Sequence, residues 1–366
     1  MGGIFKSTDG GDSWSEASRG LANYFVEALA INPCDRDQVY AGTWGGGVFK
    51  SRNGGKSWFD ANDGLTGAIV PALLPDPEDS DALYAGTAAG VYRNDSEGWE
   101  ALDRGMPCRS VWQLVSDPQH TGRLYATTFG DGVFTSTDHG RKWLPLNNGL
   151  TNLNVISLAI DPTNARTMWA GVWRGGGVFK SMDRGRTWTA SNAGLPPTRS
   201  IWSLTIDAAH PATLYAATDF DGLFRSTDGG ANWSNIGLQG DFVWPVAIDP
   251  TDAQIIYAGT LGTGIFKSTD AGRTWLPINN GLTGLVVRSL AIDSQNPSIV
   301  YASTRGGDVF KTTNAGESWT SIRNGLRVAG VESVVLDPND QNILYAGTTG
   351  DGVFVSFDAG ANWSRK

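Results

Sequence analysis

The chain has 366 residues, of which 48 are glycine and 15 are tryptophan, and its formal charge at pH 7 is −9. So much glycine excludes a mainly helical protein or a coiled coil, and the tryptophan content excludes a disordered chain. The negative charge argues against nucleic-acid binding, and no apolar run approaches the ~20 residues that span a bilayer, so we expect no membrane insertion.

The first predicted element is half of a repeating unit. Residues 1–24 contain an alternating Ile-Phe-Lys-Ser segment, a turn and Trp14, which together predict a two-stranded hairpin. No apolar signal core precedes this hairpin. From 25 to 366 a longer unit of about 44 residues recurs eight times, and the tryptophan that closes its turn returns every 41 to 45 residues. A period of this length indicates a repeat architecture.

Each full unit is predicted to hold four short β segments, a to d, separated by Gly or Asp-Pro turns. Segment a is an apolar run such as 155–160, and segment b reads Tyr-Ala-Gly-Thr, as at 40–43. Segment c alternates as Val-Phe-Lys-Ser, as at 48–51, and segment d begins at the tryptophan and leads to Asn-Gly-Leu, as at 148–150. Four antiparallel strands in about 40–45 residues make one propeller blade, which buries its faces by stacking on its neighbours.

The predicted fold class is therefore all-β, a β-propeller of four-stranded antiparallel blades, and we expect eight of them. We expect a single domain over 1–366, with a half-blade hairpin at 1–24 and eight full repeats at 25–366. The half-blade is either spare or exchanged into ring closure, and its open edge offers strand exchange with another molecule. The repeats alone leave rings of another blade number open.

The turn between segments c and d carries the pattern Ser-x-Asp-x-Gly-x-x-Trp, with Asn in place of Asp in two copies. We expect the short acidic or amide side chain to accept hydrogen bonds within its own turn, and the tryptophan to pack between blades. A calcium site is a weaker alternative, because one carboxylate per turn does not make a cage of 6–8 oxygens. The predicted structural positions are Asp9, Asn53, Asp138, Asp183, Asp228, Asp270, Asn314 and Asp358.

This turn resembles the Asp-box, or BNR, repeat of sialidase-like propellers, and the resemblance covers nearly the whole chain. The same repeat occurs in family 74 xyloglucanases, sortilin-type receptors and photosystem assembly factors. The resemblance implies the propeller fold, a binding face opposite the Asp-box turns, and a secreted or cell-surface parent. It does not imply one function, because these families act differently on one scaffold.

A four-stranded meander sorts the loops onto two faces. The a–b loops and c–d turns share one side of the ring, the bottom face, and the b–c and d–a loops share the other, the top face. We call the residues at one equivalent position of all the repeats a column. On the top face the residue type varies freely from repeat to repeat in two columns, one directly after segment b and one at the start of segment a. We assign Trp44, Phe129, Trp173, Phe220 and Arg305 to the first column and Glu27, Trp112, Trp202, Trp244, Arg288 and Glu332 to the second.

The aromatic members of these columns predict a ligand platform, because exposed rings suit the apolar faces of sugars. The alternative is that the tryptophans only plug the central channel. The proposed ligand-binding residues are Trp44, Trp112, Phe129, Trp173, Arg174, Trp202, Phe220, Trp244, Arg288 and Arg305.

Catalytic chemistry has a weaker signal. The histidines, His120, His139 and His210, all fall in bottom-face loops, so a His-based triad or metal site on the top face is not expected. Glu27 and Glu332 share a column in the first and last full units, and closure at eight blades would make them neighbours. They are the candidate acid and base of a glycoside hydrolase.

The preferred interpretation is a non-catalytic binding module that recognises a carbohydrate or a protein partner and needs no cofactor or metal. The first alternative is a glycoside hydrolase of the Asp-box propeller type, and the second is an amplified repeat scaffold without a specific ligand.

Overall fold

The computed structural model describes residues 5–365 except 8–9, 17–25, 32–37, 53–56, 66–68, 77–78, 80–81, 96–97, 103, 107–109, 197–199, 306–308, 323–330, 338–339, 349–351 and 357. Only the backbone is described at 5–7, 10–16, 27, 29, 31, 95, 121, 335–337, 340–343, 345, 347–348, 352–356 and 358–365.

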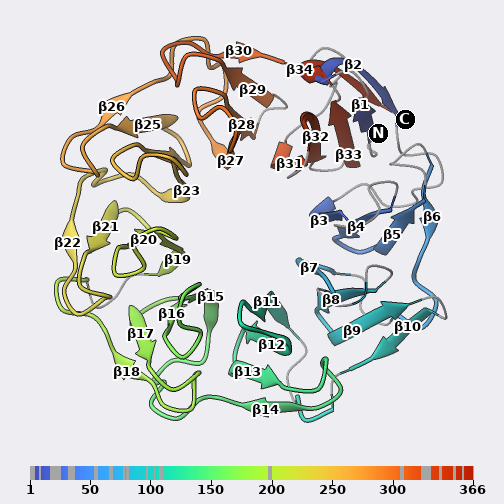
Figure 1. The fold of residues 1–366 in the computed structure, drawn as a ribbon, viewed down its shortest axis with the longest axis vertical. Coiled ribbons are helices and arrows are strands. Elements are labelled where there is room, and N and C mark those ends of the chain that lie inside the picture. Colours follow the sequence, from blue (N-terminus) through green and yellow to red (C-terminus); the bar gives the residue numbers. More distant parts are fainter. Residues whose placement is uncertain are drawn as a thin grey trace.

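The described strands form eight sheets arranged around a central axis, which confirms the predicted all-β propeller (Figure 1). Blades 1 and 2 contain β3 (Val26–Ile31), β4 (Val39–Thr43), β5 (Gly47–Ser51) and β6 (Phe59–Asp60), then β7 (Ala72–Pro75), β8 (Leu83–Thr87), β9 (Gly90–Asp95) and β10 (Gly98–Ala101). Blades 3 and 4 contain β11 (Val111–Asp117), β12 (His120–Thr128), β13 (Gly132–Ser136) and β14 (Trp143–Pro145), then β15 (Val155–Ile160), β16 (Met168–Val172), β17 (Val178–Ser181) and β18 (Thr189–Ala190).

The second half of the ring repeats this order. Blades 5 and 6 contain β19 (Ile201–Ile206), β20 (Leu214–Thr218), β21 (Leu223–Ser226) and β22 (Ser234–Asn235), then β23 (Val243–Ile248), β24 (Ile256–Thr260), β25 (Ile265–Ser268) and β26 (Leu276–Pro277). Blades 7 and 8 contain β27 (Val287–Ile292), β28 (Val300–Thr304), β29 (Val309–Thr312) and β30 (Thr320–Ser321), then β31 (Val331–Asp337), β32 (Asp340–Thr348), β33 (Gly352–Ser356) and β34 (Asp358–Arg365).

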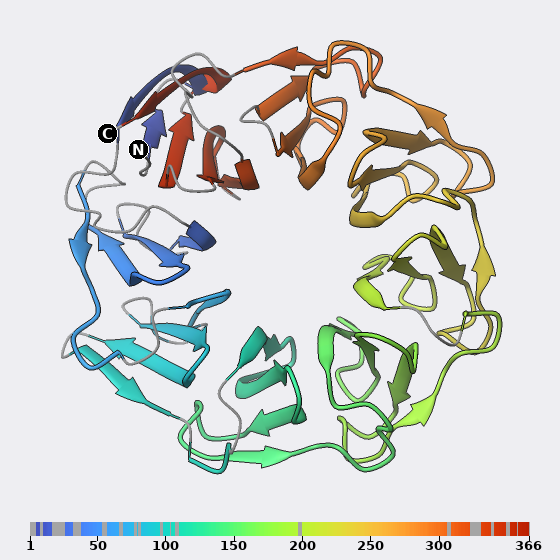
Figure 2. The same ribbon diagram turned by 180° about the vertical axis from the view of Figure 1, so that it is seen from behind.

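Within each blade the first strand lies nearest the axis and the fourth lies on the outer rim (Figure 2). All pairings within the eight repeats are antiparallel, and β15 coincides with the apolar segment expected at 155–160. Outer strands such as β18 have only two residues, so little unpaired edge is presented to solvent.

The ring closes between its first and last blades. Strand β3 contacts β31 and β32, which makes blades 1 and 8 neighbours. The N-terminal hairpin of β1 (Phe5–Ser7) and β2 (Gly10–Glu16) joins the sheet of blade 8 through parallel pairing of β2 with β34. Exchange of this hairpin with a second molecule stays a prediction.

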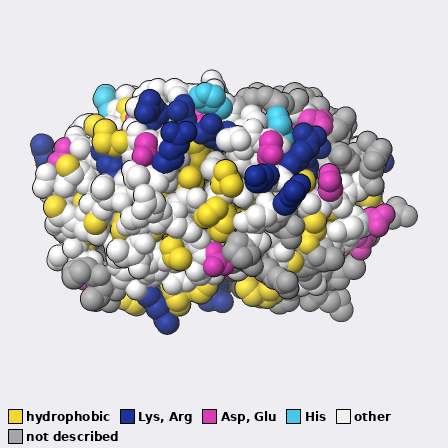
Figure 3. Space-filling model, turned by 90° about the horizontal axis from the view of Figure 1, so that it is seen from below, with side chains coloured by type: hydrophobic (Ala, Val, Ile, Leu, Met, Phe, Trp, Pro, Cys, Tyr) yellow, Lys and Arg dark blue, Asp and Glu magenta, His cyan; other side chains and the backbone are white. Residues whose placement is uncertain are grey.

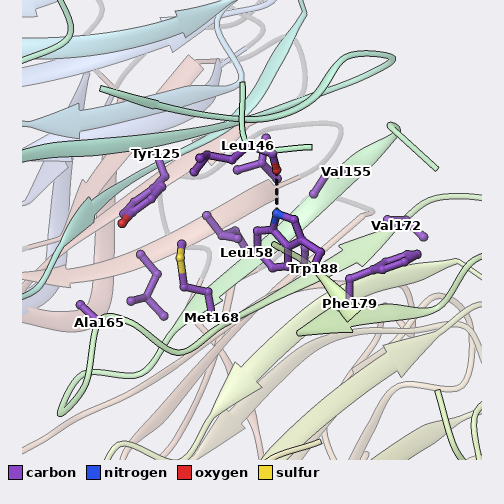
Figure 4. Packing of buried hydrophobic residues seen from close by; sticks show 12 residues of the cluster. Tyr125, Leu146, Val155, Leu158, Ala165, Met168, Val172, Phe179 and Trp188 are labelled. Carbon is purple, nitrogen blue, oxygen red and sulfur yellow. Dashed lines mark hydrogen bonds between the residues drawn. The ribbon is translucent and has the colours of Figure 1, made fainter. Parts of the chain in front are cut away.

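The hydrophobic core is divided among the contacts between blades. Between blades 3 and 4, the Tyr125 and Leu146 side chains pack with Val155, Met168 and Trp188 (Figure 4). Successive side chains of a strand point to opposite faces of the sheet, so blades 2 to 6 each contribute to two such clusters, one with either neighbour.

The Asp-box turn is a network of short hydrogen bonds. In blade 3 the Ser136 Oγ donates to Asp138 Oδ1 at 2.7 Å and accepts from the Gly140 N–H at 2.8 Å, while the Lys142 N–H donates to Asp138 Oδ1 at 2.9 Å. Corresponding bonds form at Asp183, Asp228, Asp270 and Asn314. Asp9 and Asn53 lie outside the described residues, and only the backbone of Asp358 is described.

The turn's tryptophan joins adjacent blades by a hydrogen bond that the apolar-wedge interpretation did not anticipate. In blades 2 to 7 the indole N–H donates to a backbone carbonyl at the end of the preceding blade. The distance is 2.6 Å from Trp188 to Leu146 and 2.7 Å from Trp233 to Ser191. The tryptophan backbone adds a second link, since the Trp188 N–H donates to the Asn148 carbonyl at 2.8 Å.

A further link between blades comes from a cation on the third strand. The Lys267 ammonium lies 5.4 Å from the centre of the Tyr257 ring and donates to the Ala315 carbonyl of the next blade at 2.8 Å. In blade 3 the equivalent residue is Thr135, and the positive charge between the blades comes instead from Arg184 of blade 4, whose Nε lies 3.7 Å from Asp117 Oδ2.

Two Asp-box carboxylates, Asp228 and Asp270, predict that the protein loses stability at acid pH. Hydrogen bonds from Asn232 lower the pKa of Asp228 to about 2, and those from Thr274 lower the pKa of Asp270 to about 2, from an ordinary 3.8. Between about pH 4 and pH 2 the unfolded chain therefore binds more protons, and stability should fall as the pH is lowered through this window. The urea midpoint measured from pH 5 to pH 2 should show that decline.

The matched variant for this response is Asp228→Asn with Asp270→Asn. Asn314 already accepts the Thr312 hydroxyl at 2.7 Å and the Ser318 N–H at 3.0 Å without a charge, so the variant should fold. Its urea midpoint should decline less between about pH 4 and pH 2. An unchanged slope would assign the acid response to other groups.

Candidate functional site

The variable column at the start of segment a occupies a β-bulge. The register of β19 against β20 shifts between Ile201 and Ser203, so Trp202 is the extra residue without a cross-strand partner. Equivalent register shifts leave Trp112, Arg288 and Glu332 without a cross-strand partner in their blades. In blade 6 the shift leaves two residues unpaired, Trp244 and Pro245. A bulge turns its side chain out of the regular alternation, which frees this column from core packing.

The column after segment b is anchored to the next blade by isolated β-bridges. Trp44 bridges Ile69, and Phe129 bridges Asn154. In blade 5 the bridging residue is Asp219, so our assignment of Phe220 to this column was wrong by one position. Phe220 follows the bridge, with φ of 70° and 55% of its surface exposed.

Four aromatic side chains on the top face form a contiguous series, which we call the aromatic row: Phe220, Phe242, Trp202 and Trp244. The ring centres lie 5.7 Å apart between Phe220 and Phe242, 5.2 Å between Phe242 and Trp202, and 5.3 Å between Trp202 and Trp244. Phe242 was not predicted, because it lies one residue before β23 and belongs to neither variable column. The row spans blades 5 and 6 and leaves Phe220 mostly exposed.

The aromatic row continues into a charged pair. The Arg288 guanidinium lies 4.4 Å from the centre of a Trp244 ring, and its Nε donates to Glu332 Oε2 at 2.5 Å. Blades 6, 7 and 8 are thus linked by side chains of one column. Glu332 was expected to face Glu27 beside Arg288. Its carboxylate binds Arg288, but the Glu27 side chain lies outside the described part of the chain, so the pairing of the two carboxylates stays a prediction.

A second aromatic contact lies over blades 3 and 4. The ring centres of Phe129 and Trp173 are 4.9 Å apart at 51°, and the Arg174 guanidinium lies 4.0 Å from a Trp173 ring. The Arg174 N–H donates to Ser200 Oγ at 3.1 Å, and Ser200 Oγ donates to Asp219 Oδ2 at 3.2 Å. These bonds connect this contact to the loop that carries Phe220.

The other proposed ligand-binding residues, Trp44, Trp112 and Arg305, are not part of these two aromatic groups. Trp44 is 50% exposed and Trp112 is 36% exposed, so both offer open ring surface. Within the described part of the chain, Trp112 makes no ring contact with the aromatic row. Arg305 is exposed, and its N–H donates to the Val286 carbonyl at 2.8 Å.

The histidines lie at the bottom face as expected, His139 and His210 in loops and His120 as the first residue of β12. Nδ1 of His210 is 3.1 Å from Asp207, and Nδ1 of His120 is 3.4 Å from Asp117. A side view shows histidines with Lys and Arg side chains along one rim of the ring (Figure 3). A cavity of about 360 Å³ at this face is lined by Asp76, Asp79, Arg93, Glu100, Leu102, His139 and Arg141.

The described residues contain neither a metal-binding cluster nor a membrane-spanning helix. No group of three or more His, Cys, Asp or Glu side chains in that part of the chain is placed to hold a metal ion. No helix in it is long and apolar enough to cross a membrane.

Comparison with known proteins yields structural likeness only, since no family model and no curated protein matches the chain. The GH74 xyloglucanase from Xanthomonas campestris aligns at 18% identity over 96% of this chain and 68% of its own, with a TM-score of 0.63. Sqt1 of Chaetomium thermophilum, bound to the N-terminus of the ribosomal protein L10, aligns at 14% identity over 91% of this chain and 96% of its own, with a TM-score of 0.66.

The computationally designed Ika8 protein aligns at 12% identity over 92% of this chain and 98% of its own, with a TM-score of 0.66. At these identities the likeness shows the fold. The chain is an eight-bladed β-propeller, and most of its c–d turns carry the Asp-box pattern.

Proposed function

We propose that the chain is a non-catalytic carbohydrate-binding module whose top face recognises a glycan chain. The aromatic row carries this proposal. Sugars present apolar C–H faces edged by hydroxyl groups, and a row of rings that ends in Arg288 and Glu332 offers matching surfaces, donors and acceptors. Similarity to a protein described as a xyloglucanase supports the ligand class.

The rigidity of this face also supports a binding role. The bridge between Asp219 and Phe242 ties adjacent blades directly beneath the row, and the Leu261 N–H donates to the Phe242 carbonyl at 2.9 Å. Side chains held on paired strands lose less conformational freedom on binding than side chains on free loops. A preformed surface therefore suits a ligand that forms few strong individual contacts.

Binding is favoured over hydrolysis by the pairing of Glu332. A glycosidase needs two carboxylates facing each other across the scissile bond. One oxygen of Glu332 instead binds the Arg288 guanidinium, whose other side rests on Trp244. This arrangement suits a fixed charged edge to the aromatic row.

The test is affinity electrophoresis of the purified protein in gels that contain soluble polysaccharides, with new reducing ends measured in parallel. We expect retardation without new reducing ends. Trp173→Ala with Trp202→Ala should weaken retardation at least about tenfold, because stacked rings contribute about 0.5–1.5 kcal/mol each beyond their buried area. Thermal unfolding of both proteins would show whether the variant remains folded.

Phe59→Ala is the matched control, because Phe59 is 39% exposed on the outer strand β6. It should bind as the parent protein does. Unchanged retardation of a folded double variant would contradict the aromatic platform. New reducing ends that disappear in Glu332→Gln would establish the hydrolase instead, and retention by a protein ligand alone would establish a protein-binding propeller.

A further inference from the structure

We propose that Arg174, stacked on Trp173, is a subsite for the carboxylate of a uronic acid unit in the bound glycan. This inference rests on the proposed function and names the chemical class of its ligand. It concerns one loop, between β16 and β17 of blade 4, and its contacts with blades 3 and 5.

The N–H groups of the Arg174 guanidinium are accessible to a ligand. The Arg174 Cζ lies 4.0 Å from the centre of a Trp173 ring, and within the described part of the chain the guanidinium donates no hydrogen bond. Arg174 is exposed, and no carboxylate within the described part of the chain forms an ion pair with it. A planar fork of N–H groups matches the two oxygens of a carboxylate, which it binds in bidentate fashion.

The backbone at Arg174 adopts a conformation that favours glycine. Its φ is 54°, in the left-handed region, and the second residue of the shorter b–c loops of blades 1, 3 and 6 is Gly45, Gly130 or Gly262, while in blade 5 it is Phe220 with φ of 70°. A side chain in this region costs about 1–2 kcal/mol where glycine costs nothing. An arginine at such a position is consistent with a binding role of its side chain at the surface, because strained residues often occur at functional sites.

The loop is also locked in place. Asn152 Nδ2 donates to the carbonyls of Trp173 at 2.9 Å and Gly175 at 2.6 Å, and the Arg174 N–H donates to Ser200 Oγ at 3.1 Å. These bonds come from two connections between blades, so the guanidinium starts from a fixed base. Preorganisation of this kind lowers the entropy lost when an anion is bound.

A ring surface for the sugar adjoins the guanidinium. Phe129 is 39% exposed, and its ring meets Trp173 at 51°, which forms an open corner beside Arg174. A pyranose can rest its apolar face on this corner with its carboxylate turned toward the arginine. The net charge of −9 weakens general attraction to polyanions, so the comparison of the parent protein with Arg174→Gly is what would report a specific site.

The experiment compares polygalacturonate with fully methyl-esterified polygalacturonate, which keeps the sugar chain and removes only the charge. A neutral glycan, xyloglucan, and poly-L-glutamate complete the set of probes. We expect the parent protein to be retarded more strongly by polygalacturonate than by its ester. Arg174→Gly should remove that difference, with a loss of about tenfold to a hundredfold for the acid form.

Arg174→Gly puts glycine at a position of positive φ, which glycine adopts without strain, so the variant should fold, and its melting temperature checks this. Arg273→Ala, an exposed arginine in an Asp-box turn, is the matched control and should not change the preference. Equal retardation by both forms and by xyloglucan would overturn the carboxylate subsite but leave the glycan platform intact. Equal retention by poly-L-glutamate would overturn it in favour of an acidic protein ligand, and no retention by any polysaccharide would overturn both proposals.

Discussion

Trp188→Ala should lower the free energy of unfolding by about 3–5 kcal/mol, the range for removing a large buried aromatic side chain. Trp188 is 3% exposed and fills the core between blades 3 and 4 with Leu146 and Met168. Its loss would leave a cavity and would also leave the Leu146 carbonyl, now bonded at 2.6 Å, without its donor. Urea unfolding followed by tryptophan fluorescence or circular dichroism measures the change.

Trp188→Phe separates the two contributions. It keeps most of the apolar volume and removes the indole N–H, so we expect a loss of about 1–3 kcal/mol, mainly from the unsatisfied carbonyl and less from the smaller ring. Trp44→Ala is the control for removing a tryptophan, since Trp44 is 50% exposed and should cost less than about 1 kcal/mol. If Trp188→Phe proves as stable as the parent protein, the hydrogen bond between blades contributes nothing measurable.

Gly149→Ala is expected to have the second large effect. Gly149 belongs to the Asn-Gly-Leu segment and has φ of 94°, and a Cβ there would collide with the backbone carbonyl of Trp188. The left-handed conformation costs about 1–2 kcal/mol with a side chain, and displacing the neighbouring blade adds about 1–3 kcal/mol. The carbonyl belongs to the residue whose N–H donates to Asn148 at 2.8 Å, so the change should loosen the contact between blades.

Gly240→Ala is the matched control for Gly149→Ala. Gly240 has φ of 89°, and no atom of the described residues lies within 4 Å of the position that an added Cβ would take. It therefore shares the backbone cost and lacks the collision. The difference between the two urea midpoints isolates the close approach of adjacent blades. Equal destabilisation would show that the ring absorbs the added carbon without loss.

The arrangement of the strands followed from the sequence because its causes are local. The alternation in Val178 to Ser181, the apolar run of 155–160 and the turn around Asp183 each specify a neighbouring stretch of backbone. Repeating these signals eight times also specified the ring, because a single blade cannot bury its own faces. The division into top-face and bottom-face loops followed from the order of the segments.

The composition of the candidate site depended on contacts between repeats. The bulge that frees Trp202 and the bridge that places Asp219 ahead of Phe220 are set by pairing register, which one repeat does not reveal. The distance from Phe242 to Trp202 depends on how one blade is rotated against the next.

Two further features needed the closed ring. Residues about 44 positions apart in the sequence, Arg288 and Glu332, become neighbours because adjacent blades present the same column side by side. The Trp188 indole reaches the Leu146 carbonyl of the preceding blade for the same reason. The blade, its turns and the face that varies could thus be predicted from the amino-acid sequence, because they depend on local pattern. Which of the variable side chains meet could not, because their contacts depend on the close packing of one blade against the next.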